Sequence, residues 1–357
     1  MENTFDIVYT ENLPAIFFEN KFSVMLTTYQ AGKLIVLGSN DGTKLYQTPI
    51  TFKKPMGIAL QGKKMAIACL DEIRFFSAEE NIEEVLNKDG SAYDCAYAQR
   101  ATYHTGILDI HDLEFGEGVI WGVNTLLSCL AVYDISYSFK PKWKPPFINA
   151  LVPEDRCHLN GMAMLANVPK YITALSRTNS EQGWRADKMN SGILMSVPDG
   201  ELILDGLAMP HSPRNYNGML YFLESGKGTL MAVDLKTEKA EEIFNFGCFI
   251  RGLSFIGNVA VIGKSKIRDT SNDFNDLRVK EGSMNAGLIF FDLLERKIIG
   301  GINYTNSVEE IFEVKVLEDI INPAILPCEF ETYQHIVTHP GNKFWKTDQR
   351  SSTIGDN

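Results

Sequence analysis

The stretch Asp112-Leu-Glu-Phe-Gly-Glu-Gly-Val-Ile-Trp-Gly-Val123, followed by Leu130-Ala-Val-Tyr-Asp134, contains the pattern that decides the fold. A short apolar strand leads through a tight turn into a second strand, and a third strand follows and ends in aspartate. The same order occurs in Arg251-Gly-Leu-Ser-Phe-Ile-Gly-Asn-Val-Ala-Val-Ile-Gly263 with Leu288-Ile-Phe-Phe-Asp292. Short apolar runs closed by Gly, Asn or Asp predict an all-β protein, and their repetition predicts equivalent structural units.

The spacing of these units indicates which all-β architecture they form. First strands begin near six positions that lie 39 to 58 residues apart: Gly57, Asp112, Gly161, Pro213, Gly252 and Glu310. That length fits a four-stranded propeller blade with variable loops. We therefore predict a six-bladed β-propeller. Five or seven blades remain alternatives, because residues 153–206 are difficult to divide into strands.

The two ends of the chain complete each other. Before Gly57 lie three strands without a first one (Ser23–Thr28, Lys33–Gly38 and Leu45–Thr51), and no clear strand follows Glu310–Val316. Joining them makes one composite blade, which closes the ring and removes exposed sheet edges. We expect residues 1–330 to form this single domain and the polar residues 331–357 to be a partly disordered tail. The best helical candidate is Ala78–Leu86.

Composition limits the classes of function. The chain has 357 residues and a net charge of −11, whereas proteins that coat nucleic acids are usually basic. No apolar run is long enough for a membrane helix, and the first 20 residues do not resemble a signal peptide. The six cysteines are widely spaced without a CxxC pair, which is typical of a reduced, cytoplasmic protein. Neither GxGxxG nor GxxxxGK[ST] follows a strand, so we expect no nucleotide cofactor.

Polar residues gather at the starts of the predicted first strands, which in a propeller lie around the mouth of the central channel. The set contains His111 with Asp112, His158 with Asn160, His211, Arg251, and Glu309 with Glu310. Converging neutral histidines suit a divalent metal such as Zn, Mn or Fe, often with a carboxylate, or general acid–base catalysis. We predict His111, His158, His211, Glu309 and Glu310 as catalytic residues, with the three histidines as candidate metal ligands. The alternative is that the imidazoles only bind neighbouring backbone groups.

A second group of side chains is predicted to bind substrate on the same face. Cations gathered at a cleft suit a carboxylate, phosphate or sulfate group, and an exposed tryptophan can stack on a ligand, although it more often fills the gap between blades. The predicted substrate-binding residues are Arg251, Asn160, Asp112, Asn124, Arg177, Trp184, Arg185 and Lys264. Acidic residues in the long Lys264–Ala286 loop could instead neutralise its cations locally.

Six segments together resemble an uncharacterised bacterial family of conserved hypothetical proteins, a domain of unknown function. They are Leu108-Asp-Ile-His-Asp112, Trp121-Gly-Val-Asn-Thr125, Pro153-Glu-Asp-Arg-Cys-His-Leu-Asn-Gly161, Gly206-Leu-Ala-Met-Pro-His-Ser-Pro-Arg214, Phe249-Ile-Arg-Gly-Leu253 and Val308-Glu-Glu-Ile-Phe312. The resemblance extends from about Phe17 to Pro327 and coincides with the predicted blade starts. It supplies no activity to transfer.

Other six-bladed propellers offer an analogy at the level of fold only. Calcium-dependent lactonases of this fold bind the metal through Glu, Asn and Asp. The candidate equivalents in this chain are Glu309 or Glu310, Asn160, Asn124 and Asp112. Propeller lyases rely on channel histidines. Our first hypothesis is a lyase, hydrolase or isomerase acting on a small anionic molecule or peptide. The second is a non-catalytic propeller that binds a protein or peptide, such as an accessory factor in biosynthesis. The oligomeric state stays open.

Overall fold

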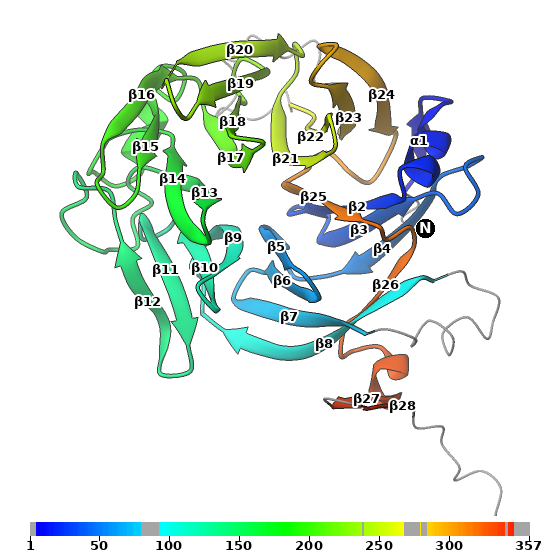
Figure 1. The fold of residues 1–357 in the computed structure, drawn as a ribbon. Coiled ribbons are helices and arrows are strands. Elements are labelled where there is room, and N and C mark those ends of the chain that lie inside the picture. Colours follow the sequence, from blue (N-terminus) through cyan, green and yellow to red (C-terminus); the bar gives the residue numbers. More distant parts are fainter. Residues whose placement is uncertain are drawn as a thin grey trace, which may run out of the picture.

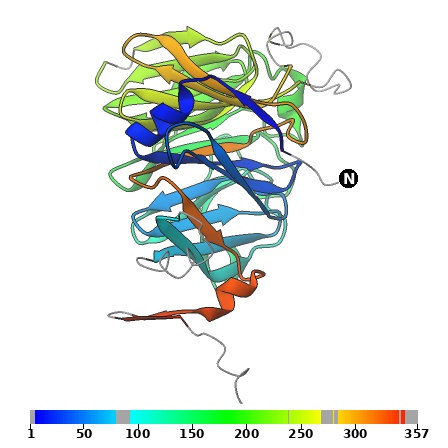
Figure 2. The ribbon, with the colours of Figure 1, turned by 90° about the vertical axis from the view of Figure 1, so that its right-hand side faces the viewer.

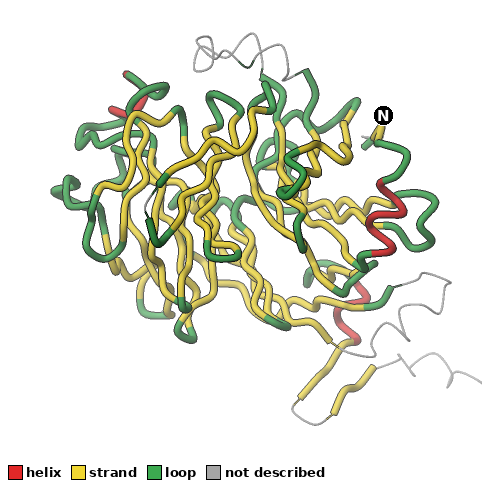
Figure 3. Tube along the Cα trace, turned by 45° about the horizontal axis from the view of Figure 1, so that its top comes forward, coloured by secondary structure: helices red, strands yellow, loops and turns green. Residues whose placement is uncertain are grey.

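The computed structural model describes residues 5–79, 93–237, 239–267, 279, 284–339 and 342–345. Within these residues six antiparallel sheets stand in a ring around a central axis, as Figure 1 shows, and strands account for most of the trace in Figure 3. The prediction of a six-bladed β-propeller is confirmed, and the alternatives of five and seven blades are excluded.

The first four blades follow one another along the chain, and each runs from an inner strand to an outer one. The first blade holds β5 (Ile58–Gln61), β6 (Lys64–Ala68), β7 (Glu72–Glu79) and β8 (Cys95–His104). The second holds β9 (Ile110–Gly116), β10 (Val119–Asn124), β11 (Cys129–Asp134) and β12 (Tyr137–Trp143). The third holds β13 (Leu159–Leu165), β14 (Val168–Ala174), β15 (Gly192–Ser196) and β16 (Leu202–Leu207). The fourth holds β17 (Pro210–Tyr216), β18 (Met219–Glu224), β19 (Thr229–Asp234) and β20 (Ala240–Asn245).

The last two blades use both ends of the chain. The fifth holds β21 (Ile250–Ile256), β22 (Val259–Lys264), β23 (Gly287–Asp292) and β24 (Lys297–Tyr304), with β1 (Ile7–Tyr9) added at its outer edge. In the sixth, β25 (Glu313–Glu318) pairs with β2 (Phe22–Thr28), which is followed by β3 (Lys33–Gly38) and β4 (Tyr46–Thr51). The predicted closure is therefore confirmed, because a C-terminal inner strand completes three N-terminal strands.

Two further segments lie outside the regular blades. The strand β26 (Pro323–Leu326) adds in parallel to β8. The 3-10 turn η4 (Glu331–His335) then leads to a hairpin of β27 (Ile336–His339) and β28 (Asn342–Trp345), which projects from the ring in Figure 2. The predicted partly disordered tail covers residues 331–357: its described part forms η4 and this hairpin, and residues 340, 341 and 346–357 are outside the described residues.

Helix is rare in the described residues: besides η4 there are the 3-10 turn η2 (Gly183–Ala186) and one short α-helix. The helix α1 (Leu13–Glu19) carries Pro14 in its first turn, where proline is tolerated because that N–H has no partner in the helix. Its Phe17 stacks on Phe22, with 4.5 Å between ring centroids, and so covers the junction of blades five and six. The predicted helix at Ala78–Leu86 is wrong at its start, because Ala78 and Glu79 belong to strand β7, and residues 80–86 are outside the described residues. None of the described helices is long and apolar enough to span a membrane.

Inner strands of neighbouring blades touch where glycine allows it. A Cβ atom on Gly57 would lie 2.9 Å from the Asp112 Cα atom in the next blade. One on Gly252, whose φ is +81°, would lie 2.9 Å from the Val314 nitrogen. Because these contacts are backbone atoms, a larger residue would separate the blades. The glycines near the predicted blade starts therefore allow the inner strands to approach one another closely around the central channel, where the candidate site lies.

Candidate functional site

A cavity of about 580 Å³ opens at the mouth of the central channel, where the inner strands start. Its size is within the range of small-molecule sites. Eight of the residues predicted from the sequence line it together: His111, His158, His211, Arg251, Glu309, Glu310, Trp184 and Arg185. Blade topology thus brings to one cavity residues that are almost 200 positions apart in the chain.

Left-handed backbone turns aim the histidines at this cavity. Asp109 has a φ of 55° and Met209 a φ of 53°, and each lies two residues before a histidine. The turn directs each carbonyl toward the following ring, so that His111 Nδ1 lies 3.1 Å from the Asp109 oxygen and His211 Nδ1 lies 2.9 Å from the Met209 oxygen. A left-handed non-glycine residue costs about 1 kcal/mol. This turn, which occurs before both His111 and His211, therefore fixes the orientation of each ring at a local cost in backbone energy.

The third histidine is held by a carboxylate instead of a carbonyl. His158 Nδ1 lies 3.1 and 3.0 Å from the two carboxylate oxygens of Asp155. Trp184 Nε1 donates to the same carboxylate at 2.9 Å, and the Trp184 ring lies 4.5 Å from the His158 ring. The indole is only 7% exposed, and Arg185 lies 4.3 Å over it. The buried Trp184 ring therefore packs against His158 and helps to position it. Because His158 and Arg185 cover the indole, little of it is left for the predicted stacking on a ligand.

All three rings use Nδ1 to bind the protein. An Nδ1–H that donates to a carbonyl or carboxylate leaves Nε2 as the unprotonated nitrogen of a neutral ring. Within the described residues no hydrogen bond involves Nε2 of His111, His158 or His211. The alternative, that the imidazoles only bind neighbouring groups, accounts for Nδ1 of each ring but not for Nε2. The other nitrogen is left for a ligand in the cavity.

Electrostatics keep two of the rings neutral. Burial lowers the pKa of His111 and of His211 well below the usual value, and the charges of Arg251 and His158 lower both further. Burial also raises the pKa of the nearby Asp109 carboxyl, although His158 and Arg251 oppose this shift. At neutral pH His111 and His211 therefore offer lone pairs, not positive charge.

Arg251 supplies the positive charge of the cavity. Its guanidinium carbon lies 3.4 Å from the centroid of the Phe312 ring, which is a cation–π contact. Within the described residues its side chain has neither a hydrogen bond nor a salt bridge. Burial lowers the pKa of Arg251, and the surrounding carboxylates of Glu310 and Glu313 limit that shift. A half-buried guanidinium without a direct partner among the described residues is suited to an anionic group of a ligand.

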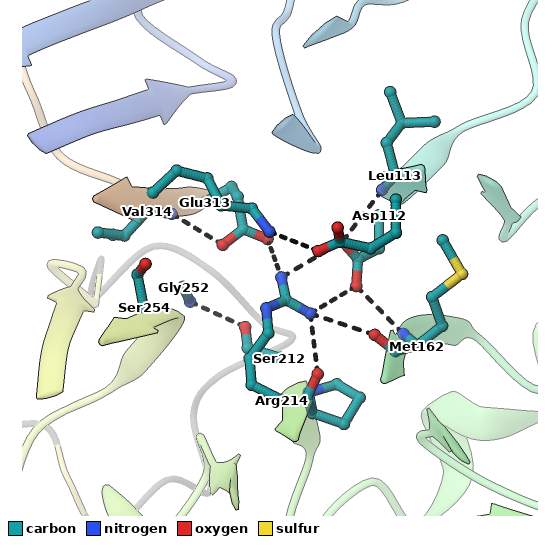
Figure 4. Close-up of polar contacts among 12 residues, drawn as sticks. Asp112, Leu113, Met162, Ser212, Arg214, Gly252, Ser254, Glu313 and Val314 are labelled. Atoms are coloured by element: carbon teal, nitrogen blue, oxygen red, sulfur yellow. Dashed lines mark hydrogen bonds and ion pairs between the residues drawn. The ribbon is translucent and has the colours of Figure 1, made fainter. Parts of the chain in front are cut away.

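A second arginine, Arg214, binds carboxylates of two other blades. Arg214 donates to Asp112 at 2.8 and 3.3 Å and to Glu313 at 2.6 Å, so one side chain joins blades two, four and six (Figure 4). Asp112 also accepts from the backbone of Leu113 and Met162. Burial alone would lower the pKa of Arg214, but Asp112 and Glu313 together raise it. This three-residue group, the Arg214 triad, joins the inner strands of three blades and lies outside the cavity lining.

Five residues predicted to bind substrate lie outside the cavity lining. Asp112 belongs to the Arg214 triad, Asn160 bridges to Pro210 in the next blade and accepts from Thr173, and Asn124 accepts from Tyr133. Arg177 is exposed in its loop, and Lys264 lines a different pocket between β22 and β24. The geometry therefore assigns Asp112, Asn160 and Asn124 to the support of the blades, because their side-chain oxygens bond within the protein.

Sequence reasoning missed several residues of the site. Asp155, Asp109 and Phe312 contact the predicted histidines and Arg251, and Lys188 also lines the cavity. A signal for two of them was present, because Asp109 and Asp155 lie two and three residues before a predicted histidine. No periodic pattern distinguishes Phe312 from a core residue.

The side chains of the site match the requirements of a metal ion only in part. Neutral histidines with a bonded Nδ1 resemble metal ligands, whose second nitrogen normally binds a carboxylate or carbonyl. Nevertheless, within the described residues no three His, Cys, Asp or Glu side chains are grouped closely enough to hold an ion. The oxygens of Asn160, Asn124 and Asp112 that calcium would need are engaged within the protein. A metal at this cavity stays a prediction.

Comparisons with known proteins support the fold. A chain from the crystal structure titled "Crystal structure of Nidogen/Laminin Complex", itself a β-propeller, is similar with a TM-score of 0.50 at 8% sequence identity. The match covers 84% of this chain and 98% of that one, and at this identity it speaks for the fold alone. No curated protein matches in sequence. A family model described as "Domain of unknown function (DUF4915)" matches residues 11–326, so the chain belongs to this family of β-propeller proteins.

Proposed function

We propose that the protein is an enzyme of the lyase, hydrolase or isomerase type that binds a small anionic molecule, or the carboxylate of a peptide, at the mouth of the channel. The observation that carries this proposal is the Arg251 guanidinium. It is half-buried beside the cavity, rests on Phe312 and has no hydrogen-bond partner among the described residues. Such a cation is costly to bury alone, and a ligand anion would supply its missing partner.

Two features favour an enzyme over the alternative, a non-catalytic propeller that binds a protein or peptide. A binding module is expected to use a broad, flatter surface, whereas this site is a cavity of about 580 Å³. It also contains two histidines whose pKa values are lowered by burial, and perturbed titratable groups are common in catalytic sites.

We include a cytoplasmic location in this proposal. None of the six cysteines, all of which are among the described residues, forms a disulfide bond. Free thiols of this kind are typical of reducing compartments.

The proposal predicts that Arg251→Met abolishes anion binding. Malonate and inorganic phosphate serve as probes, and isothermal titration calorimetry measures their dissociation constants. Removing the charged partner of a buried anion costs about 2–5 kcal/mol, so we expect affinity to fall by a factor of roughly 30 or more. Arg251→Lys should retain part of it, because lysine keeps the charge without the planar fork.

Arg177→Met is the matched control, since Arg177 is exposed outside the cavity lining. It should bind both probes as the wild type does. Equal affinities of the wild type and Arg251→Met, or no binding of either probe by the wild type, would contradict an anion site at Arg251.

A metal-dependent version of this function is favoured by one observation, the engagement of all three Nδ1 atoms by the protein. It predicts a stoichiometric transition metal in the purified protein that is lost in a His111→Ala/His158→Ala double variant. Inductively coupled plasma mass spectrometry measures this content. Equal metal content in both proteins would remove the metal from the proposal and leave acid–base chemistry.

A further inference from the structure

The three histidines of the cavity differ in the group that holds Nδ1. The nearest partner of Nδ1 is a backbone carbonyl in His111 and His211, with the Asp109 carboxylate at 3.7 Å from the first and the Ser225 hydroxyl at 3.0 Å from the second, whereas only in His158 does a carboxylate lie at hydrogen-bond distance. The difference matters for proton transfer. A carboxylate behind an imidazole fixes the tautomer with a free Nε2 and stabilises the imidazolium that forms when Nε2 accepts a proton. A neutral carbonyl stabilises that cation less.

The pair of His158 and Asp155 is held rigidly. Both residues have left-handed backbones, with φ values of 50° and 45°. Their side chains are 15% and 14% exposed, and the second contact of the carboxylate is Trp184 Nε1–H at 2.9 Å. The loop itself is tied to other elements, since the Asp155 nitrogen donates to the Leu126 oxygen at 2.9 Å. Strained residues persist where the surrounding structure enforces them, often at functional sites.

The pair faces the same cavity as Arg251. The His158 ring lies 4.8 Å from the His111 ring, which lies 5.2 Å from the Phe312 ring that carries the Arg251 guanidinium. These side chains form one continuous wall of a cavity of about 580 Å³. One small molecule can therefore contact both Arg251 and His158.

We propose that His158 is the proton-transfer group of this site, positioned by Asp155, and that it acts on the carbon next to a carboxylate bound by Arg251. This inference rests on the proposed function, because it assigns a reaction to the same site. His158 Nε2 takes the proton from that carbon, and the C–H electron pair moves into the carboxylate to give an enediolate. Arg251 stabilises the added negative charge.

Two balanced outcomes follow from the enediolate. In an isomerase, the enediolate turns within the cavity and the imidazolium returns its proton to the opposite face of the same carbon, which inverts the configuration there. In a lyase, the electron pair forms a double bond to the neighbouring carbon and expels a leaving group, which receives the proton from His158. Neither outcome needs an oxidant, a reductant or a second substrate. The substrate class is therefore a carboxylic acid with a hydrogen on the adjacent carbon.

The test uses the uncharged probe 5-nitrobenzisoxazole, so that it does not depend on anion binding. A base removes the proton from its carbon 3, the nitrogen–oxygen bond breaks, and coloured 2-cyano-4-nitrophenolate forms. We expect the wild type to accelerate this reaction above buffer and His158→Gln to lose about 100-fold of that acceleration, the usual contribution of a general base. The control His104→Gln, on a ring with 79% exposure, should retain the wild-type rate.

The role of Asp155 has its own readout. Asp155→Asn removes the carboxylate but keeps the side-chain size, so kcat for the probe should fall at least tenfold while KM stays unchanged. If Asp155 has only a structural role, Asp155→Asn should change both kcat and KM, or neither of them. Circular dichroism verifies that the variant is folded. Added imidazole should restore activity to His158→Ala, which separates a missing base from a damaged fold.

The outcomes separate this inference from the proposed function. Equal probe rates in the wild type and His158→Gln would overturn the role of His158. If malonate inhibits the wild type but not Arg251→Met, both proposals are supported. If the probe reaction depends on His158 but malonate does not inhibit it, His158 is the base and the anion site at Arg251 is wrong.

Discussion

Replacing Arg214 with methionine should lower the free energy of unfolding by about 3–5 kcal/mol, the usual cost of breaking a buried ion pair from one side. The guanidinium is buried between Asp112 and Glu313, with contacts of 2.8 and 2.6 Å. Without it two carboxylates from different blades remain in the channel with no cation between them. Urea denaturation followed by circular dichroism measures the change.

Much of this loss of stability should come from the two carboxylates that remain without a cation, and not only from the lost hydrogen bonds of Arg214. A triple variant, Arg214→Met/Asp112→Leu/Glu313→Leu, removes all three charges and should recover most of the stability, because a hydrophobic replacement of a buried ion pair is often neutral. Backbone groups that Asp112 binds, such as the Met162 nitrogen, limit the recovery. A loss below about 1 kcal/mol in Arg214→Met would show that the triad does not hold the blades together.

The fold could be predicted because its signals are local and repeated. Alternating strands, turn residues and a constant unit length define a propeller, and the missing first strand near the N-terminus defines its closure. The helix α1 was not predicted, because seven residues that begin with Leu13 and Pro14 are too short to show a helical period. Its position depends on packing against Phe22 and Phe290, which are remote in sequence.

The site could be predicted only in part for the same reason. Position in the repeat identified His111, His158, His211 and Arg251, because every blade starts at the channel. It could not separate His111 from Asp112, the next residue along the strand, whose carboxylate binds an arginine 102 positions away. Adjacent strand residues point in opposite directions, so a ligand-facing residue and a structural one alternate. The sequence alone does not say which partner each meets.

Below about pH 6.5 the protein should lose stability steeply because of His111 and His211. Burial lowers the pKa of each ring well below the usual value of 6.5. The unfolded chain binds protons at both rings as the pH falls through 6.5, and the folded protein does not. Stability is therefore fully present above this pH and decreases below it, by about 2 kcal/mol for each histidine at pH 5.

A comparison of variants isolates these two rings from other titrating groups. The double variant His111→Gln/His211→Gln should lose about 4 kcal/mol less than the wild type between pH 8 and pH 5. His104→Gln is the control, since it changes an exposed ring and leaves both buried rings in place. Urea denaturation at each pH gives the free energies. Equal losses in the wild type and the double variant would mean that the folded protein also protonates these rings. In that case burial would not keep the His111 and His211 rings neutral as the pH falls to 5.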